Sequence, residues 1–137
     1  YRFEAMSQPR FAAGLSTRVD LSAALDEVCA AVQSLQPSID LAMVFVSQDR
    51  ASDCQQIADT LCDRLGTERL LGCTAESLVG TAREVENDTA ISLWAAHLPR
   101  VLITPMHLDY VKTPDGGVIN GWPNGYETEW PANAAMF

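Results

Sequence analysis

Hydrophobic residues in the first 75 positions form short continuous runs that alternate with stripes of helical spacing. The runs at residues 11–15, 39–47 and 70–73 have the length of strands. The stripes between them repeat every three or four residues, which is typical of amphipathic helices. They consist of Leu21, Ala24, Leu25, Val28, Ala31, Val32 and Leu35, and of Cys54, Ile57, Ala58, Leu61, Cys62 and Leu65. This β-α-β-α-β order predicts parallel neighbouring strands joined by right-handed crossovers.

Polar residues and glycine mark the ends of the two predicted helices. Asp20 stands where an N-cap belongs in the first helix, and Pro37 closes that segment. Ser52 or Asp53 would cap the second helix, and Gly66 suits a left-handed C-terminal cap.

The pattern changes after residue 76. Residues 77–83 predict a loop or a short helical turn. Two β-rich runs follow at residues 85–98 and 101–108, separated by Pro99 and Arg100 alone. Strands joined by so short a turn pair antiparallel. The predicted fold class is therefore α/β, a layered structure whose mixed sheet has a parallel start followed by an antiparallel strand pair.

The last 25 residues combine turn signals with large aromatic side chains. Residues 114–117 are Pro-Asp-Gly-Gly, and Trp122, Tyr126 and Trp130 follow. We expect residues 1–10 to be disordered or added sequence, 11–110 to form the α/β domain, and 111–137 to be an irregular tail. Because aromatic side chains need a covering surface, we expect the tail to begin a further C-terminal portion or to pack on a partner chain. The alternative is a tail wrapped over its own domain.

Charge and composition exclude several classes of partner. The chain has 9 basic and 18 acidic residues, a net charge of −9, and no basic run. Nucleic acid is therefore not expected as a partner. No apolar run approaches the roughly 18–20 residues of a membrane helix, and no signal peptide is evident. We expect a soluble, cytoplasmic protein without membrane insertion.

Four cysteines lie too far apart for a zinc site. Cys29, Cys54, Cys62 and Cys73 include no C-x-x-C pair. A disulfide framework does not fit an intracellular domain of this size. We expect the cysteines to act as small buried apolar residues, and we expect neither a metal nor a cofactor.

The predicted strand ends carry the candidate binding residues. Ligands of open α/β sheets bind beyond the carboxyl ends of the strands, where helix N-termini favour anionic groups. The three ends supply hydroxyls, acids and the arginines Arg18 and Arg50. The candidate ligand-binding residues are Ser16, Thr17, Ser47, Cys73, Thr74 and Glu76. A small anionic or zwitterionic metabolite would suit this rim. Helix capping is the alternative role for each Ser, Thr or acidic residue taken singly.

Signs of catalysis are few. Cys73 would be a nucleophile if a base lowered its pKa. The histidines, His97 and His107, lie on the later predicted strands, and nothing brings either to Cys73. Glu84 and Glu86 share one face of an extended segment without a second acidic cluster, so a solvated edge is expected. Phosphate-cradling and nucleophile-elbow patterns are absent. We expect a protein that is not an enzyme.

Four motifs in order resemble the N-terminal part of the FIST sensory domain. They are Ala13-Gly-Leu-Ser-Thr17, Val44-Phe-Val-Ser47, Leu71-Gly-Cys-Thr-Ala-Glu76 and the segment from Glu84 to Ser92. The resemblance implies a ligand-sensing module of bacterial signal transduction that binds amino acids or similar small molecules. It also implies a C-terminal FIST portion and, in some proteins, kinase or methyl-accepting output modules. It implies no catalytic residues.

Two alternatives to a small-ligand sensor stay open. One is a hydrolase or transferase that depends on the Cys73 thiol. The other is an interaction or oligomerisation fragment without a ligand, in which the aromatic tail docks on another chain. A homo-oligomer is compatible with both the sensor and the interaction fragment.

Overall fold

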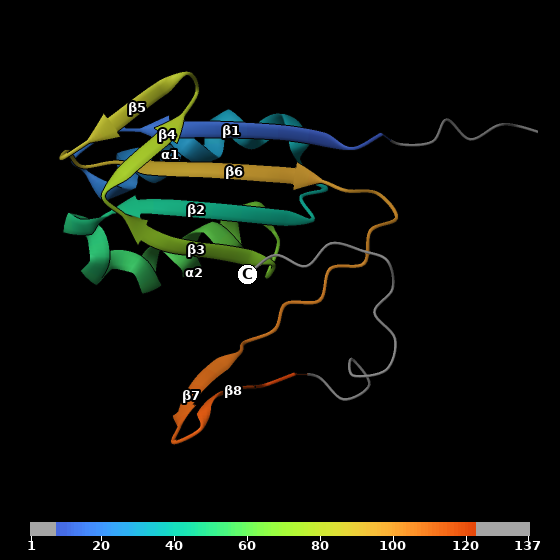
Figure 1. The fold of residues 1–137 in the computed structure, drawn as a ribbon. Coiled ribbons are helices and arrows are strands. Elements are labelled where there is room, and N and C mark those ends of the chain that lie inside the picture. Colours follow the sequence, from blue (N-terminus) through green and yellow to red (C-terminus); the bar gives the residue numbers. More distant parts are fainter. Residues whose placement is uncertain (1–7, 123–137) are drawn as a thin grey trace, which may run out of the picture. The chain divides into compact units, whose positions relative to one another are not determined.

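The computed structural model describes residues 8–122 and divides into two units that meet between Ile103 and Thr104. The first unit contains a four-stranded sheet, two helices and a small hairpin (Figure 1). The second unit contains a two-stranded hairpin. The predicted α/β class with a mixed sheet is confirmed.

The main sheet has the order β1-β6-β2-β3. It is formed by β1 (Arg10–Ser16), β6 (Ile91–His97), β2 (Leu41–Ser47) and β3 (Leu70–Ala75). β2 and β3 are parallel neighbours, as predicted. The expectation that β1 and β2 are also neighbours is wrong, because β6 lies between them and pairs antiparallel with both. β6 is apolar on both faces, which suits a central position, whereas β1 begins with a charged residue and lies at the edge.

The prediction of a strand at residues 101–108 is wrong. No strand occupies these residues, and His107 therefore lies outside any strand. The antiparallel partners of β6 come instead from β1 and β2, which are far away in the sequence. A run of β-prone residues does not show whether these residues form a strand or which strand they would pair with, because strand pairing depends on tertiary contacts.

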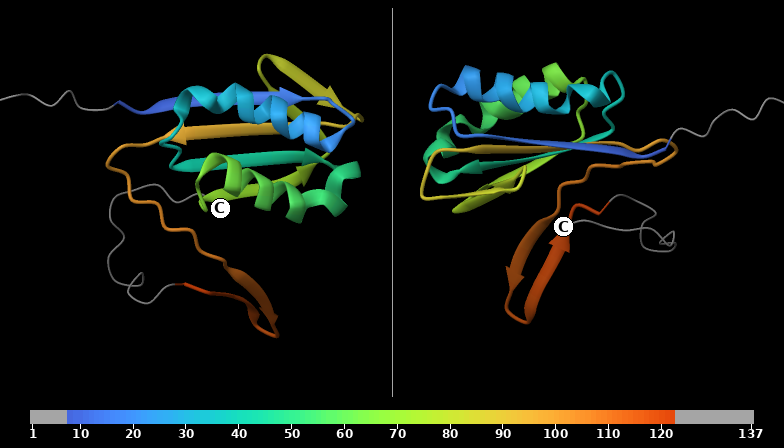
Figure 2. Two further views of the ribbon diagram at one scale, coloured as in Figure 1. Left: turned by 180° about the vertical axis from the view of Figure 1, so that it is seen from behind. Right: turned by 90° about the horizontal axis from the view of Figure 1, so that it is seen from above.

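Both long helices lie on one face of the main sheet (Figure 2). They are α1 (Leu21–Val32), continued by the 3-10 helix η1 (Gln33–Leu35), and α2 (Cys54–Leu65). As predicted, the Asp20 carboxylate caps α1 by accepting from the Ala23 N–H at 2.8 Å, and Gly66 ends α2 with φ 66°. The residues before α2 form a 3-10 helix, η2 (Gln48–Asp53), and Asp53, one of the two predicted caps of α2, makes no side-chain capping bond.

The core lies between this face and the helices. Its fully buried members include Val28 of α1, Leu61 of α2 and Leu93 of β6. Gly14 of β1 permits α1 to come close, since a Cβ there would lie 2.6 Å from the Ala31 Cβ. The helix residues that are buried against the sheet thus belong to the apolar stripes that the sequence predicted.

A small hairpin covers one end of the opposite face of the sheet. It consists of β4 (Ser77–Gly80) and β5 (Arg83–Glu86) and replaces the loop or helical turn predicted for residues 77–83. Its inward residues Leu78 and Val85 form a second apolar cluster with Leu15 and Ala90. The single strand predicted over residues 85–98 is therefore two strands, since β5 and β6 are separate elements.

The second unit contains the hairpin of β7 (Asp109–Thr113) and β8 (Gly116–Asn120). Its two-residue turn is formed by Pro114 and Asp115, where the sequence predicted a turn; the flanking strands were not predicted. Tyr126 and Trp130 of the predicted aromatic tail lie outside the described residues.

Candidate ligand-binding site

Three strands that run in the same direction place the predicted site residues at their carboxyl ends. We call this border of the sheet its carboxyl edge. β1, β2 and β3 all end at this edge, where β6 begins. Because β6 separates β1 from β2, the six candidates fall into two groups. Ser16 and Thr17 lie on one side of β6, and Ser47, Cys73, Thr74 and Glu76 lie on the other. The structure therefore does not gather all six around one point.

Ser16 is occupied by contacts within the domain. Its hydroxyl is buried, donates to the Glu27 carboxylate at 2.6 Å and accepts from the Arg18 N–H at 3.2 Å. The Arg18 guanidinium also lies 3.6 Å from the Glu27 carboxylate. These bonds hold the loop after β1 against α1. Thr17, the other residue of this group, is half-buried.

Ser47 joins the end of β2 to the start of β6. Its hydroxyl accepts from the Ala90 N–H at 2.9 Å and lies 3.2 Å from the Ala90 carbonyl oxygen. Hydrogen bonds from the Ser47 hydroxyl and, second, from the Thr89 hydroxyl hold the pKa of exposed Asp49 below its ordinary value. The single Ser47 proton is shared between the Ala90 carbonyl oxygen and Asp49, because one hydroxyl donates one proton. The main role of the Ser47 hydroxyl is therefore to hold the end of β2 to the start of β6.

Arg50 has a structural role at this edge that the sequence did not reveal. Its side chain is 4% exposed, and Nη2 donates to the carbonyl oxygens of Arg18 at 2.6 Å and Val19 at 2.9 Å. Within residues 8–122, its Nε has no hydrogen-bond partner. The guanidinium ties η2 to the loop that leads into α1. The sequence placed Arg50 at the strand end, but only the fold shows that the side chain turns inward.

A hollow of the first unit lies between α2 and the strands β2 and β3. It has a volume of about 230 Å³, and its walls are mostly apolar. The lining residues are Val44, Val46, Cys54, Gln55, Ile57, Ala58, Leu70, Leu71, Gly72 and Cys73. We call it the α2–β3 crevice. Of the six residues predicted for ligand binding, only Cys73 lines it.

Gly72 is required where the α2–β3 crevice meets β2. A Cβ at Gly72 would lie 2.4 Å from the Val44 carbonyl oxygen and 2.7 Å from Val44 Cγ1. Any larger residue would push β3 away from β2, so the glycine both allows close pairing and leaves the wall of the crevice bare. The sequence signal was the glycine itself, which interrupts an apolar run and often marks close backbone approach.

Cys73 is exposed, so the expectation that it is buried is wrong. The reason is its strand: β3 is an edge strand, and Leu71 and Gly72 beside Cys73 are exposed as well. Cys29, Cys54 and Cys62 are half-buried free thiols. Burial raises the pKa of Cys29 and of Cys62 above the ordinary thiol value.

No histidine of the first unit lies near Cys73. Cys73 pairs with Phe45, which pairs with Ser92, whereas His97 lies five residues farther along β6. At about 3.3 Å per residue, this places the His97 backbone roughly 17 Å along the strand. The His97 ring lies 3.0 Å from the Asp40 carboxylate, which also accepts from the Leu98 N–H at 2.7 Å. This pair fastens the end of β6 to the start of β2.

The remaining candidates lie next to the α2–β3 crevice in the sequence but are not part of its lining. Thr74 is half-buried on β3, and Glu76 is exposed between β3 and β4. Glu84 and Glu86 are exposed on β5, and Ser77 donates to Glu84 at 3.3 Å. Across residues 8–122, no three His, Cys, Asp or Glu side chains gather as metal ligands would.

The sequence of this chain matches a known family of sensory domains. The model of the FIST N domain matches residues 40–109, just over half of the chain, from the start of β2 into β7. The chain belongs to the FIST N family, and this family consists of sensory domains of signal-transduction proteins. The resemblance inferred from the sequence motifs is confirmed.

The chain is also similar to curated proteins of undetermined function. Uncharacterised proteins from two strains of Mycobacterium tuberculosis are 29% identical over 115 residues. The alignment covers 82% of this chain and 30% of each relative, so the chain spans less than a third of the relatives that it matches. No solved structure matches the chain significantly. None of the helices in the described part of the chain is long and apolar enough to cross a membrane.

Proposed function

We propose that this chain is the small-ligand-binding part of a sensory protein and that its ligand is an amino acid or a similar small metabolite. The observation that carries the proposal is the α2–β3 crevice, which lies between α2 and the strands β2 and β3 in a member of a sensory family. Its volume is below the ~300–1,000 Å³ of sites for drug-sized molecules, so it suits only a small compound.

The chemistry of the α2–β3 crevice narrows the ligand class. The lining is aliphatic apart from Gln55 and the two thiols Cys54 and Cys73. An aliphatic or aromatic side chain of the ligand would fill the interior. Its charged groups would remain near the rim, where Gln55 and the first turn of α2 offer polar partners. Of the residues predicted at the strand ends, the proposed site retains Cys73, and its centre lies nearer to α2.

The proposed role is binding without catalysis. Ligand binding would be passed on to other parts of a longer signalling protein, such as a C-terminal FIST portion or an output module. We place the protein in the cytoplasm because its four cysteines are free thiols, as is usual in a reducing compartment.

The test is a thermal-shift screen of the chain against amino acids and small organic acids. A ligand at 100 times its Kd stabilises a protein by about 2.7 kcal/mol, which shifts Tm by several degrees in a domain of this size. Ala58→Leu should abolish the shift because it fills the α2–β3 crevice. Ala30→Leu, on the exposed surface of α1, is the matched control and should retain it.

A ligand that stabilises both variants equally binds elsewhere and would falsify the assignment to the α2–β3 crevice. If no compound stabilises the chain, the screen is repeated with the longer natural polypeptide. A negative result there counts against ligand sensing as a whole.

The exposure of Cys73 favours a second candidate, a thiol-dependent transferase or hydrolase. Its weakness is the distance from Cys73 to His97 along β6. Alkylation of the native protein separates the candidates, with Cys73→Ser identifying the site. A rate like that of a free thiol agrees with a binding protein. A rate far above it at neutral pH would show an activated nucleophile.

A further inference from the structure

Strand β3 has a neighbouring strand on one side only. It lies at the border of the main sheet, next to β2, and in the described part of the chain no strand pairs with its other side (Figure 1). The Ala42 N–H donates to the Arg69 carbonyl oxygen at 3.0 Å, so the Arg69 carbonyl faces β2. The backbone groups of successive strand residues point to opposite sides. The N–H and C=O groups of Leu70, Gly72 and Thr74 therefore point away from β2, and we call them the free edge of β3.

The free edge is neither paired nor protected within residues 8–122. The backbone hydrogen bonds outside the regular elements include none to Leu70, Gly72 or Thr74. β3 also contains no charged residue and no proline, which commonly keep an edge strand from pairing. The strand at the opposite border, β1, begins with Arg10. An unpaired, uncharged edge such as that of β3 is a template for a further strand.

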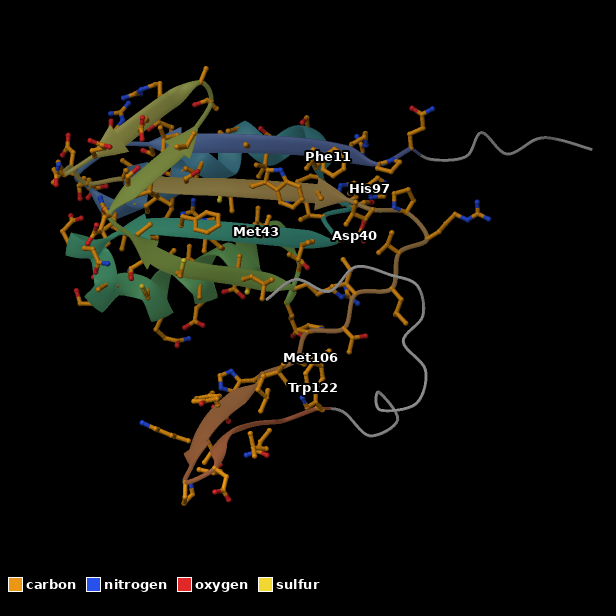
Figure 3. The ribbon with its side chains drawn as sticks, viewed as in Figure 1. Phe11, Asp40, Met43, His97, Met106 and Trp122 are labelled. Atoms are coloured by element: carbon orange, nitrogen blue, oxygen red, sulfur yellow. The ribbon has the colours of Figure 1, made fainter. Side chains whose placement is uncertain are left out.

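The residues of the free edge also lie on the face that α2 covers. Met43, which pairs with Leu71, lies on the face away from the helices (Figure 3). Because side chains alternate along a strand, Leu70, Gly72 and Thr74 belong to the face toward α2. Leu70 and Gly72 line the α2–β3 crevice, and Gly72 is exposed. Since Gly72 has no side chain, the crevice is open at this residue to a group that lies beside the free edge.

We propose that the α2–β3 crevice binds a peptide in extended conformation, which adds to β3 as an antiparallel strand. This ligand class rests on the function proposed above: the bound group is an amino acid residue within a peptide rather than a free amino acid. In a hydrogen-bonded antiparallel pair, opposite residues exchange both backbone bonds, and their side chains lie on the same face. The peptide residue opposite Gly72 therefore bonds to the Gly72 N–H and C=O groups and places its side chain in the crevice.

The crevice determines which side chain the peptide presents. Its volume of about 230 Å³ and its walls of Val44, Val46 and Ile57 suit one aliphatic side chain such as that of leucine. A large apolar side chain opposite a strand glycine also covers the backbone that the glycine leaves bare. In strand addition of this kind, the main-chain hydrogen bonds supply affinity and the side-chain pocket supplies specificity.

Acidic residues around the crevice favour a basic peptide. Asp59 and Asp63 lie on α2, Glu68 precedes β3, and all three are exposed. Burial raises the pKa of the Cys62 thiol, and the charges of these three acids raise it further, so the acids lie close together. Arg69 offsets one of their charges. Lysines two positions before and after the apolar residue would lie on the same face of the peptide and meet this negative charge.

The test is isothermal titration calorimetry of the full chain with the peptide acetyl-Lys-Ala-Leu-Ala-Lys-amide. N-methylation of the leucine removes the N–H that faces Gly72 and should weaken binding at least about tenfold. N-methylation of the alanine before the leucine removes an N–H that points away from β3. This peptide is the matched control and should bind like the parent peptide. Free leucine should bind more weakly than the peptide, as should a peptide with glutamate in place of both lysines.

Variants of the chain test the same contacts from the other side. Ala58→Leu fills the crevice and should abolish peptide binding, whereas Ala30→Leu should retain it. Thr74→Pro removes one N–H of the free edge and should weaken binding several-fold. Proline is tolerated on an edge strand where the N–H faces solvent, and circular dichroism checks the folding of each variant. The methylated peptides act on the unaltered chain, so they decide the question even if Thr74→Pro does not fold.

Amide hydrogen exchange locates the peptide on the unaltered chain. The parent peptide should slow the exchange of the Gly72 and Thr74 N–H groups. The Cys73 N–H faces β2 and should change little, which makes it an internal control. Slow exchange of the Gly72 N–H before any peptide is added would show that another part of the polypeptide already pairs with the free edge, and it would overturn the proposal.

The binding data can overturn the proposal in other ways. Equal binding of the two N-methylated peptides overturns strand addition. Weakening by the methylated alanine but not by the methylated leucine overturns the antiparallel pairing. If free leucine binds more tightly than the peptide and Ala58→Leu abolishes its binding, the crevice is a ligand site as proposed, but strand addition is wrong. If neither the peptide nor any amino acid binds, both proposals fail.

Discussion

The two faces of the main sheet are built from the same four strands but differ in what covers them. One face packs under α1 and α2, with fully buried residues such as Leu93 and Val28. The other is covered at one end by a hairpin of two four-residue strands and leaves Phe11, Phe45 and Leu71 partly exposed. The difference shows that alternation along a strand fixes which residues share a face, while the elements that cover each face decide its stability and function.

The largest difference between the faces should appear on truncation of leucine. Leu93→Ala on the helix-covered face should lower the free energy of unfolding by about 3 kcal/mol, because a fully buried side chain leaves a cavity. Leu71→Ala, at the border of the other face on the edge strand β3, should cost about 1 kcal/mol, since the side chain is 43% exposed. Urea unfolding at low protein concentration measures both. Equal losses would contradict the comparison.

Glycine substitution compares how tightly each face is covered. In Gly14→Ala the new methyl group would lie 2.6 Å from the Ala31 Cβ, and α1 would have to shift, at about 1–3 kcal/mol. In Gly80→Ala it would lie 3.0 Å from the Leu15 Cβ, and the short hairpin should yield at smaller cost. Thermal unfolding of both variants tests this order. A larger loss for Gly80→Ala would mean that the hairpin is the more rigid cover.

The N-terminal caps of α1 and α2 can be compared within the layer of helices. Asp20→Ala removes the bond to the Ala23 N–H and should cost about 1 kcal/mol. Asp53 occupies the same position before α2 without a side-chain capping bond, so Asp53→Ala is the matched control and should cost less. Similar losses in urea unfolding would show that the effect comes from charge at a helix start rather than from the hydrogen bond.

The smallest effect concerns acid stability at the edge of the sheet. Hydrogen bonds from Ser47 and Thr89 hold the pKa of Asp49 below its ordinary value in the folded protein. The unfolded chain therefore binds a proton at higher pH than the folded chain does. The stability from Asp49 is present above the ordinary Asp pKa and is lost as pH falls through the lowered folded value.

Asp49→Asn should remove this part of the acid dependence. Asp63→Asn controls for the change in net charge. The measurement is Tm as a function of pH below neutrality, with an NMR titration of the Asp49 carboxyl as a direct check. An unchanged acid slope in Asp49→Asn would show that the hydroxyl bonds contribute nothing measurable, because the carboxylate is exposed and screened by solvent.

Much of the local structure could be predicted because its causes are local. The stripe from Leu21 to Leu35 marks a helical segment, Asp20 caps it, and Gly66 takes the left-handed angle that only glycine adopts without strain. The family followed from ordered motifs. The candidate site was predicted only in part, since Cys73 lines the α2–β3 crevice but Ser16 and Ser47 are held by hydrogen bonds to Glu27 and Ala90.

The sequence alone determined the helices, the three parallel strands and the family, because periodicity, caps and motif order are written in neighbouring residues. Only the tertiary structure decided that β6 enters between β1 and β2, that Arg50 turns inward and that Cys73 lies on an exposed edge. These outcomes depend on which distant segments pair. A strand of given composition can lie at the centre or at the edge of a sheet, and its neighbours settle which residues are left for function.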